Sequence, residues 1–264
     1  TSDASEHTYY TGDHAWLHII ILVVLIAAVF YLVRNNIFTR INSYLSNNEK
    51  TFIRIRNRCL IIIGLSGAAW VLLTQSNAGA DQYYVLDAAR GLRNGDYSAF
   101  RYNGYIAKYT NQIGLLFIEY IIGFIVGDYN YLFWQLLNVV MIVFTYKMFS
   151  DILGILKLPR IASLSTIILG ILFFPWTLYS VFIYGNVAGL FFATSAFKYT
   201  MLFIDSLKEF NSFKISYIVI SAFSMMLSVM VKNNYLIFMI ALIIHTVAEA
   251  LRHRNIQIIL VTCA

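Results

Sequence analysis

The sequence has few of the residues that interrupt helices or form covalent and metal cross-links. It holds two prolines, Pro159 and Pro175, and two cysteines, Cys59 and Cys263, both at or inside apolar segments. Two such cysteines give no disulfide framework and no metal spacing. The five histidines are scattered and show no spacing typical of zinc ligands. We therefore predict no protein metal ligands.

Charge is also scarce, at 12% of the 264 residues, whereas soluble domains carry about a quarter. Hydrophobic residues make up 59% of the chain, and the mean hydropathy is +0.69. This composition excludes an ordinary soluble protein. Because backbone polar groups in lipid must be satisfied internally, and because strand-like alternation is absent from the sequence, we predict an all-α polytopic transmembrane bundle.

The apolar residues form separate runs that reach or approach the roughly 20 residues needed to cross a bilayer. The runs cover residues 16–33, 60–74, 113–127, 131–149, 161–180, 185–204, 215–231 and 234–251, with a further one beginning near 255. We treat 1–264 as one transmembrane domain that has an extra N-terminal helix at 16–33. We also expect it to be a fragment of a longer protein, cut within a helix near 264.

Basic residues set the orientation, because Lys and Arg gather on the cytoplasmic side of a membrane. Six of them lie between the first two runs: Arg34, Arg40, Lys50, Arg54, Arg56 and Arg58. The same rule explains the net charge of +6 without any nucleic-acid partner. This connection is therefore placed in the cytoplasm, and the polar stretch at 78–116 is placed on the extracytoplasmic side.

Three later basic clusters decide how many segments cross. They are Lys147/Lys157/Arg160, Lys198/Lys208/Lys214 and Arg252/Arg254. If every segment crosses, all three clusters fall outside, whereas they fall inside if one segment does not cross. We favour the second arrangement, with the short, Glu119-containing segment 113–127 as a re-entrant or interfacial helix. Residues 128–130, 175–186 and 231–234 then join the polar stretch outside.

The polar stretch opens with "ADQYYVLDAARGL", which we read as a short amphipathic helix. Tyr84, Ala88 and Leu92 fall on one face at i, i+4 and i+8. Asp81 lies at the start of this helix. It is either an N-cap, for which Asp is a preferred residue, or a general base at the membrane–water boundary.

The stretch continues with "YNGYIAKYTNQIG", which is rich in tyrosines and amides. Its polar and aromatic members are Tyr102, Tyr105, Tyr109, Asn111 and Gln112. Tyrosines gather at membrane interfaces in any case, so an aromatic belt is one interpretation. The other is a platform for a sugar or a lipid head group, for which aromatic faces and amide side chains are suited.

In this topology five basic residues lie outside: Arg90, Arg93, Arg101, Lys108 and Lys232. Arg90 is expected to pair with Asp87 at i, i+3. Lys232 and Asn233 interrupt the apolar sequence "LSVMVKNNYLIFMI". They form either a simple loop with a snorkelling lysine or a functional site among apolar residues. A phosphate group on the outer face would need some of these cations.

Four stretches together resemble the GT-C superfamily of integral-membrane glycosyltransferases, over about residues 60–250. They are "ADQYYVLDAARGLRNGDYSAF", "YTNQIG", "FPWTLYSVFIYGNVAGLF" and "VKNNYLI". Protein O-mannosyltransferases and aminoarabinose transferases belong to this superfamily. Three features depart from the family pattern. Asn186 replaces an acidic residue of the second outer loop, Thr110 replaces a proline, and the helix at 16–33 is additional.

The resemblance implies transfer of a sugar from a polyprenyl-phosphate donor to a glycan, lipid or protein acceptor, on the outer face of the plasma membrane. Asp81 would activate the acceptor. The residues expected to bind substrate are Gln82, Arg90, Tyr105, Tyr109, Asn111, Gln112, Tyr184, Lys232 and Asn233. No cofactor is specified, although a divalent metal would be consistent with related oligosaccharyltransferases. The alternatives are a transporter or flippase for lipid-linked saccharides and a non-catalytic envelope-assembly subunit.

Overall fold

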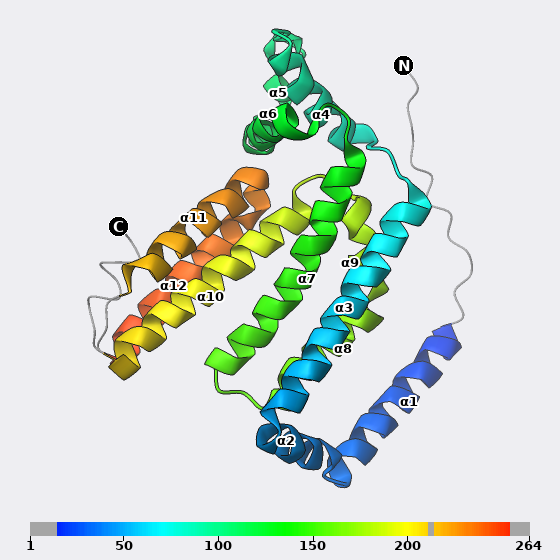
Figure 1. The fold of residues 1–264 in the computed structure, drawn as a ribbon, viewed down its shortest axis with the longest axis vertical. Helices are drawn as coiled ribbons and strands as arrows, with labels where there is room; N and C mark the ends of the chain where they lie inside the picture. The colour runs from blue at the N-terminus through cyan, green and yellow to red at the C-terminus, as the bar shows by residue number, and fades with distance from the viewer. Residues whose placement is uncertain (1–14, 211–213, 254–264) are drawn as a thin grey trace. The chain divides into compact units, whose positions relative to one another are not determined.

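A computed structural model of the chain describes residues 15–210 and 214–253, and this part is entirely helical apart from its turns and loops. It separates into two compact units, residues 1–49 and 50–264 (Figure 1). The predicted helix near 255 and Cys263 lie outside the described residues. The all-α prediction is confirmed for the part of the chain that the structure describes.

The first unit contains α1 (Ala15–Arg34) and α2 (Ile37–Asn47), joined at Asn36, whose φ is 52°. α1 corresponds to the predicted additional helix. It is long and apolar enough to cross a membrane, and its side chains are exposed along its length. This exposure is what a lipid-facing helix requires.

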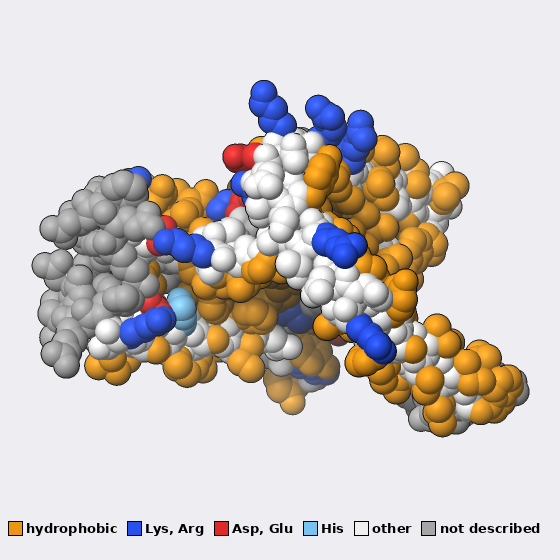
Figure 2. Space-filling view, turned by 90° about the horizontal axis from the view of Figure 1, so that it is seen from below, with side chains coloured by type: hydrophobic (Ala, Val, Ile, Leu, Met, Phe, Trp, Pro, Cys, Tyr) orange, Lys and Arg blue, Asp and Glu red, His pale blue; other side chains and the backbone are white. Residues whose placement is uncertain are grey.

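The second unit contains the other helices. In chain order they are α3 (Glu49–Thr74), α4 (Ala80–Arg93), η1 (Ser98–Phe100), α5 (Tyr105–Lys108), η2 (Thr110–Gln112), α6 (Ile113–Val126), α7 (Tyr131–Ile155), α8 (Arg160–Leu172), α9 (Phe174–Leu178), η3 (Tyr179–Val181), α10 (Asn186–Phe210), α11 (Ile215–Val231), η4 (Asn233–Tyr235) and α12 (Leu236–His253). Figure 2 shows that hydrophobic side chains cover much of the surface of the described helices.

Five helices of the described chain are long and apolar enough to span a membrane, and the number rises to seven if each of two bent helix pairs forms one span. This confirms a multi-pass membrane protein by helix length and hydropathy. One prediction is wrong: 161–180 is not a continuous helix. It breaks at Phe173 and bends by 63° between α8 and α9. Pro175 explains the break, since proline favours the first turn of a new helix.

Contacts at one end of the second unit, here called the loop end, join segments that are far apart in sequence. Gln135 at the start of α7 donates to the carbonyl of Ser76, just after α3. Gln82 in α4 accepts from the backbone N–H of Ile183. The predicted outer stretches 128–130, 175–186 and 231–234 therefore all lie at the same end as 78–116.

At the opposite end of the second unit, here called the basic end, contacts join α3, α7, α8 and α10. Arg56 of α3 pairs with Asp151 near the end of α7, and so does Lys198 of α10. The Arg160 guanidinium at the start of α8 lies 5.3 Å from the ring centroid of Phe52 in α3. These contacts place Arg160 and Lys198, from two of the later basic clusters, near the start of α3, which is itself basic. This is the arrangement predicted if one apolar segment does not cross the membrane.

The helices α4, α5 and α6 lie together at the loop end, beyond the start of α7 (Figure 1). α6 has 14 residues and so is about 21 Å long at 1.5 Å per residue, shorter than a usual span. It folds back by 100° from the preceding helical segment. A re-entrant or interfacial helix accounts for this geometry.

Hydroxyl groups and small residues hold α10 against α11. Thr200 and Ser221 are hydrogen-bonded at 2.7 Å, Ser195 and Ser224 at 3.0 Å, and Ser228 donates to the carbonyl of Gly189. Such pairs are typical of membrane helices, whose association cannot depend on hydrophobic burial alone. This rigid pair of helices ends at the loop end, where it supports the site described next.

Candidate functional site

The first turn of α4 positions Asp81. The cap residue is Gly79, without a side-chain capping bond, and Asp81 is the second residue of the helix. The interpretation of Asp81 as the N-cap is therefore wrong. Ala80 has a φ of 49°, a left-handed conformation that is unfavourable for residues with a Cβ. Backbone strain of this kind gathers at functional sites, and here it directly precedes the carboxylate.

The buried face of α4 agrees with the predicted one in part, at Ala88 and at the partly buried Leu92. Val85, Ala88 and Ala89 are buried, and they pack against Leu115 and Leu116 of α6. Tyr84 is half exposed, although it belongs to the stripe predicted from the sequence. The face also takes in Val85 and Ala89 because α6 packs against that side of α4.

The turn before α10 carries Tyr184 and is held from two sides. Gln82 accepts from the N–H of Ile183 at 2.9 Å, which links the turn to α4. Gly185 follows with a φ of +76°, and a Cβ there would lie 2.4 Å from the carbonyl oxygen of Val231. Only glycine fits both the backbone conformation and this close approach. The turn is therefore pressed against the end of α11.

Four side chains meet around Tyr184. Gln112, which is 4% exposed, donates to the Tyr184 hydroxyl at 2.7 Å, and the Tyr105 hydroxyl lies 3.4 Å from it. The ammonium of Lys232 lies 4.2 Å from the centroid of the Tyr184 ring. In addition to burial, the negative charge of Asp81 raises the pKa values of Tyr105 and Tyr184. It also opposes the lowering of the Lys232 pKa by burial, which places this carboxylate in the neighbourhood of all three groups. We call these five residues the Tyr184 cluster.

The cluster combines one carboxylate and one ammonium in a partly dry environment. Burial raises the pKa of the Tyr184 phenol, and the negative charge of Asp81 adds to this shift. Burial lowers the pKa of the Lys232 ammonium, whereas Asp81 opposes that shift. The phenol of Tyr184 therefore stays protonated at neutral pH, and the nearby carboxylate of Asp81 favours the charged form of Lys232.

Tyrosine rings extend the cluster along the polar stretch. Tyr84 stacks on Tyr105 with ring centroids 5.1 Å apart, and Tyr105 contacts Tyr109 at 4.8 Å. Asn111 lies two residues after Tyr109, Asn233 directly follows Lys232, and both are solvent-exposed. Among the predicted binding residues, Tyr105, Gln112, Tyr184 and Lys232 come together with Asp81. Gln82 holds the Tyr184 turn, and Tyr109 continues the aromatic row.

Arg90 lies in a different cluster. It pairs with Asp87, as expected, at 3.9 Å, and also with Asp128 at 3.8 Å. Its guanidinium bonds to the hydroxyl of Tyr129 and lies over the ring of that residue. Arg93 pairs with Asp128 too, and donates to two carbonyls of α6. Both arginines thus hold α4 to α6 and its following turn, and Lys232 is the cation beside Asp81.

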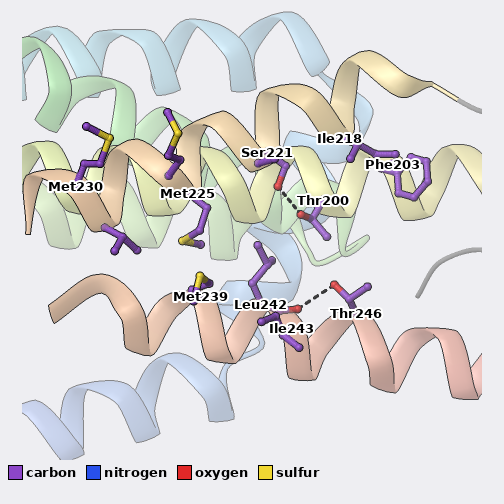
Figure 3. A pocket seen from close by; sticks show the side chains of 13 residues that line it. Thr200, Phe203, Ile218, Ser221, Met225, Met230, Met239, Leu242, Ile243 and Thr246 are labelled. Atoms are coloured by element: carbon purple, nitrogen blue, oxygen red, sulfur yellow. Dashed lines mark hydrogen bonds between the residues drawn. The ribbon is translucent and has the colours of Figure 1, made fainter. Parts of the chain in front are cut away.

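An apolar pocket of about 600 Å³ lies between α10, α11 and α12. Four methionines line it together with Ile218, Leu242 and Ile243, and Thr200 and Ser221 bond to each other in its wall (Figure 3). Figure 3 shows Met230 at one end and Phe203 at the other. Met230 is two residues from Lys232, so the pocket, which we call the α11–α12 groove, begins beside the Tyr184 cluster.

Sequence reasoning missed the groove and the role of Gly185. One signal was present: Met225, Met226, Met230 and Met239 are four of the seven methionines of the chain, within 15 residues. Flexible methionines are common where a surface adapts to varied apolar ligands. The close approach at Gly185 had no local signal, because its partner is a backbone carbonyl 46 residues away in sequence.

The described residues contain no group of three or more His, Cys, Asp or Glu side chains that could hold a metal ion. The described residues therefore offer no donor set for the divalent metal that the resemblance to oligosaccharyltransferases would allow. No protein-family model, curated protein or solved structure matches this chain.

Proposed function

We propose that this protein is a membrane glycosyltransferase that moves a sugar from a polyprenyl-phosphate donor to a cell-envelope acceptor on the extracytoplasmic face. The observation that carries the proposal is the Tyr184 cluster next to the α11–α12 groove. It combines a carboxylate, a cation and hydrogen-bonding aromatic groups at a membrane boundary, beside an apolar channel. The resemblance to the GT-C superfamily, with Asp opening the first outer loop, supports the same assignment.

Each part of such a reaction has a matching residue. Asp81 accepts the proton of the acceptor hydroxyl, whose oxygen attacks the anomeric carbon of the sugar. The bond from that carbon to the phosphate oxygen breaks, and its electron pair leaves with polyprenyl phosphate. Lys232 stabilises the negative charge that develops on the phosphate. Tyr105 and the exposed Tyr109 hold the sugar or the head group through their rings, and the buried Gln112 orients the Tyr184 hydroxyl.

The α11–α12 groove provides a place for the lipid chain. Its lining is almost entirely aliphatic, thioether and aromatic, which suits an isoprenoid. From Met230 to Ile218 it follows α11 for 12 residues, or about 18 Å at 1.5 Å per residue. A chain in this groove would bring its phosphate to the loop end, beside Lys232.

The test is transfer of labelled sugar by the full chain in nanodiscs, with labelled lipid-linked saccharide extracted from the membranes of the producing cells as the donor. Asp81→Asn should lower the rate by about 10²- to 10⁴-fold, the usual contribution of a general base. Asp87→Asn is the matched control, since it removes the same charge from the same helix. Equal rates for wild type and Asp81→Asn would contradict the assignment.

A transporter of lipid-linked saccharides is the second candidate. Ionisable groups buried among apolar membrane helices are typical of transport paths, and Glu119 is a buried carboxyl group in the apolar helix α6. A transporter should tolerate Asp81→Asn. Movement of labelled lipid-linked saccharide across vesicle membranes, undiminished in Asp81→Asn and without transfer to acceptor, would favour this candidate.

A further inference from the structure

Three cations converge on one carboxylate at the basic end. Asp151 of α7 accepts from Lys198 of α10 at 2.7 Å and from Lys147 of α7 at 3.0 Å. The Arg56 guanidinium of α3 lies 3.6 Å from its other oxygen. We call these four residues the Asp151 cluster. It joins α3, α7 and α10 at the basic end, whereas the Tyr184 cluster lies at the loop end.

The charges of this cluster do not balance. Three positive side chains share one negative one, which leaves a formal charge of +2. Arg56, Asp151 and Lys198 are only 17–19% exposed. Charges withdrawn from water are costly unless they are paired, and a single carboxylate cannot pair three cations. The site therefore favours an additional anion.

The cluster is accessible on the side of Lys147, whose side chain is 40% exposed. Val140 and Phe144 precede Lys147 on the same face of α7, at i−7 and i−3, and they are 48% and 49% exposed. Lys147 thus lies next to an exposed apolar stripe. The cation suits the head group of a phospholipid, and the stripe suits its acyl chain.

Aromatic and basic groups continue the site toward α8. The guanidinium carbons of Arg56 and Arg160 lie 5.8 Å and 5.3 Å from the centroid of the Phe52 ring. Arg160 begins α8, and Asp151 is four residues before the end of α7, so the cluster lies near where the spans leave the membrane. Phospholipid phosphates occupy this level of a bilayer.

We propose that the Asp151 cluster binds the phosphate of an anionic phospholipid in the leaflet at the basic end. The head group accepts from Lys147 and Arg56, and an acyl chain lies along Phe144 and Val140. Basic pockets between transmembrane helices are suited to anionic head groups, and a guanidinium can donate two bonds to a phosphate. This site is independent of the proposed transfer reaction.

The experiment compares dioctanoyl phosphatidylglycerol, dioctanoyl phosphatidylcholine and inorganic phosphate as ligands of the full chain in detergent. Binding is measured from the rise in thermal unfolding midpoint at increasing ligand concentration. Phosphatidylglycerol should bind to the wild type, whereas phosphatidylcholine at equal concentration should not shift the midpoint. Lys147→Gln should weaken phosphatidylglycerol binding about fivefold, the factor that corresponds to about 1 kcal/mol per basic residue near a membrane surface.

Lys50→Gln is the matched control, because Lys50 is exposed at the start of α3 and the variant loses the same charge at the same end. It should bind phosphatidylglycerol like the wild type, and Lys147→Arg should restore most of the affinity. Equal shifts with both phospholipids, or equal losses in Lys147→Gln and Lys50→Gln, would overturn the proposal. Inorganic phosphate binding as tightly as phosphatidylglycerol would overturn the lipid assignment.

Discussion

The close approach at Gly185 gives the sharpest test of the site's architecture. Gly185→Ala places a Cβ 2.4 Å from the carbonyl oxygen of Val231, on a residue whose φ is +76°. The left-handed backbone costs about 1–2 kcal/mol for a residue with a Cβ. Relief of the clash requires a backbone shift, and overpacking of this kind costs a further 1–3 kcal/mol or so. The expected loss is therefore about 2–5 kcal/mol.

Gly95→Ala separates these two effects. Gly95 has a φ of +78°, almost the same as Gly185, but a Cβ there would meet nothing within 4 Å. This variant should lose only the conformational cost of about 1–2 kcal/mol. The difference between the two variants then measures the contact between the Tyr184 turn and α11.

The assay is reversible unfolding in mixed micelles, followed by circular dichroism, together with the fluorescence of a probe at Cys59, a free cysteine of α3. Gly185→Ala should lower the free energy of unfolding by at least 1 kcal/mol more than Gly95→Ala, the lower limit of the overpacking cost of about 1–3 kcal/mol. Equal losses would refute the packing of the Tyr184 turn against α11, and with it the geometry of the Tyr184 cluster.

Three further predictions concern the chemistry of the site. Because burial lowers the pKa of Lys232, its charge is lost at a lower pH than that of an ordinary lysine; transfer should therefore decline as pH rises through this pKa. In a pH profile of kcat/KM, Lys232→Arg should remain active at alkaline pH, and an identical decline in both proteins would exclude Lys232 as its cause. Tyr184→Phe removes the acceptor of the buried Gln112 and should lower the free energy of unfolding by about 1–3 kcal/mol in the same micelle assay, whereas no change would refute that bond. Ala222→Trp fills the α11–α12 groove and should raise KM for the lipid-linked donor about tenfold, equivalent to roughly 55 Å² of lost apolar contact. Val219→Trp changes another exposed residue of α11, outside the groove lining, and should leave this KM unchanged.

Sequence patterns were sufficient for the helical class and for most of the apolar segments, although the 161–180 run is bent and α3 begins at Glu49, before the expected residue 60. The basic residues at the start of α3 and around Lys147 and Lys198 correctly predicted a common end, because the topology of a membrane protein follows from charge and span length. The tyrosine-rich stretch was also correctly expected to join 128–130, 175–186 and 231–234. Both features follow from the composition of short segments, which can be read from a single sequence.

Features that depend on contacts between distant segments were not predictable. The bond from Ile183 to Gln82 joins residues 101 positions apart, and it fixes the Tyr184 turn. The buried face of α4 takes in Val85 and Ala89 as well as Ala88 because α6 packs against it, and the sequence of α4 alone does not indicate this contact. Arg90 was grouped with the predicted binding residues by charge, whereas Asp128 and Tyr129 hold it in another place.

The most direct test of the central claim measures donor binding and sugar transfer in the same preparation of Asp81→Asn. The account predicts that labelled lipid-linked saccharide still binds with near wild-type affinity, because the groove and Lys232 are intact, while transfer falls about 10²-fold or more. Binding and transfer both at wild-type levels would contradict a catalytic role for Asp81 and the assignment of the Tyr184 cluster as the reaction site.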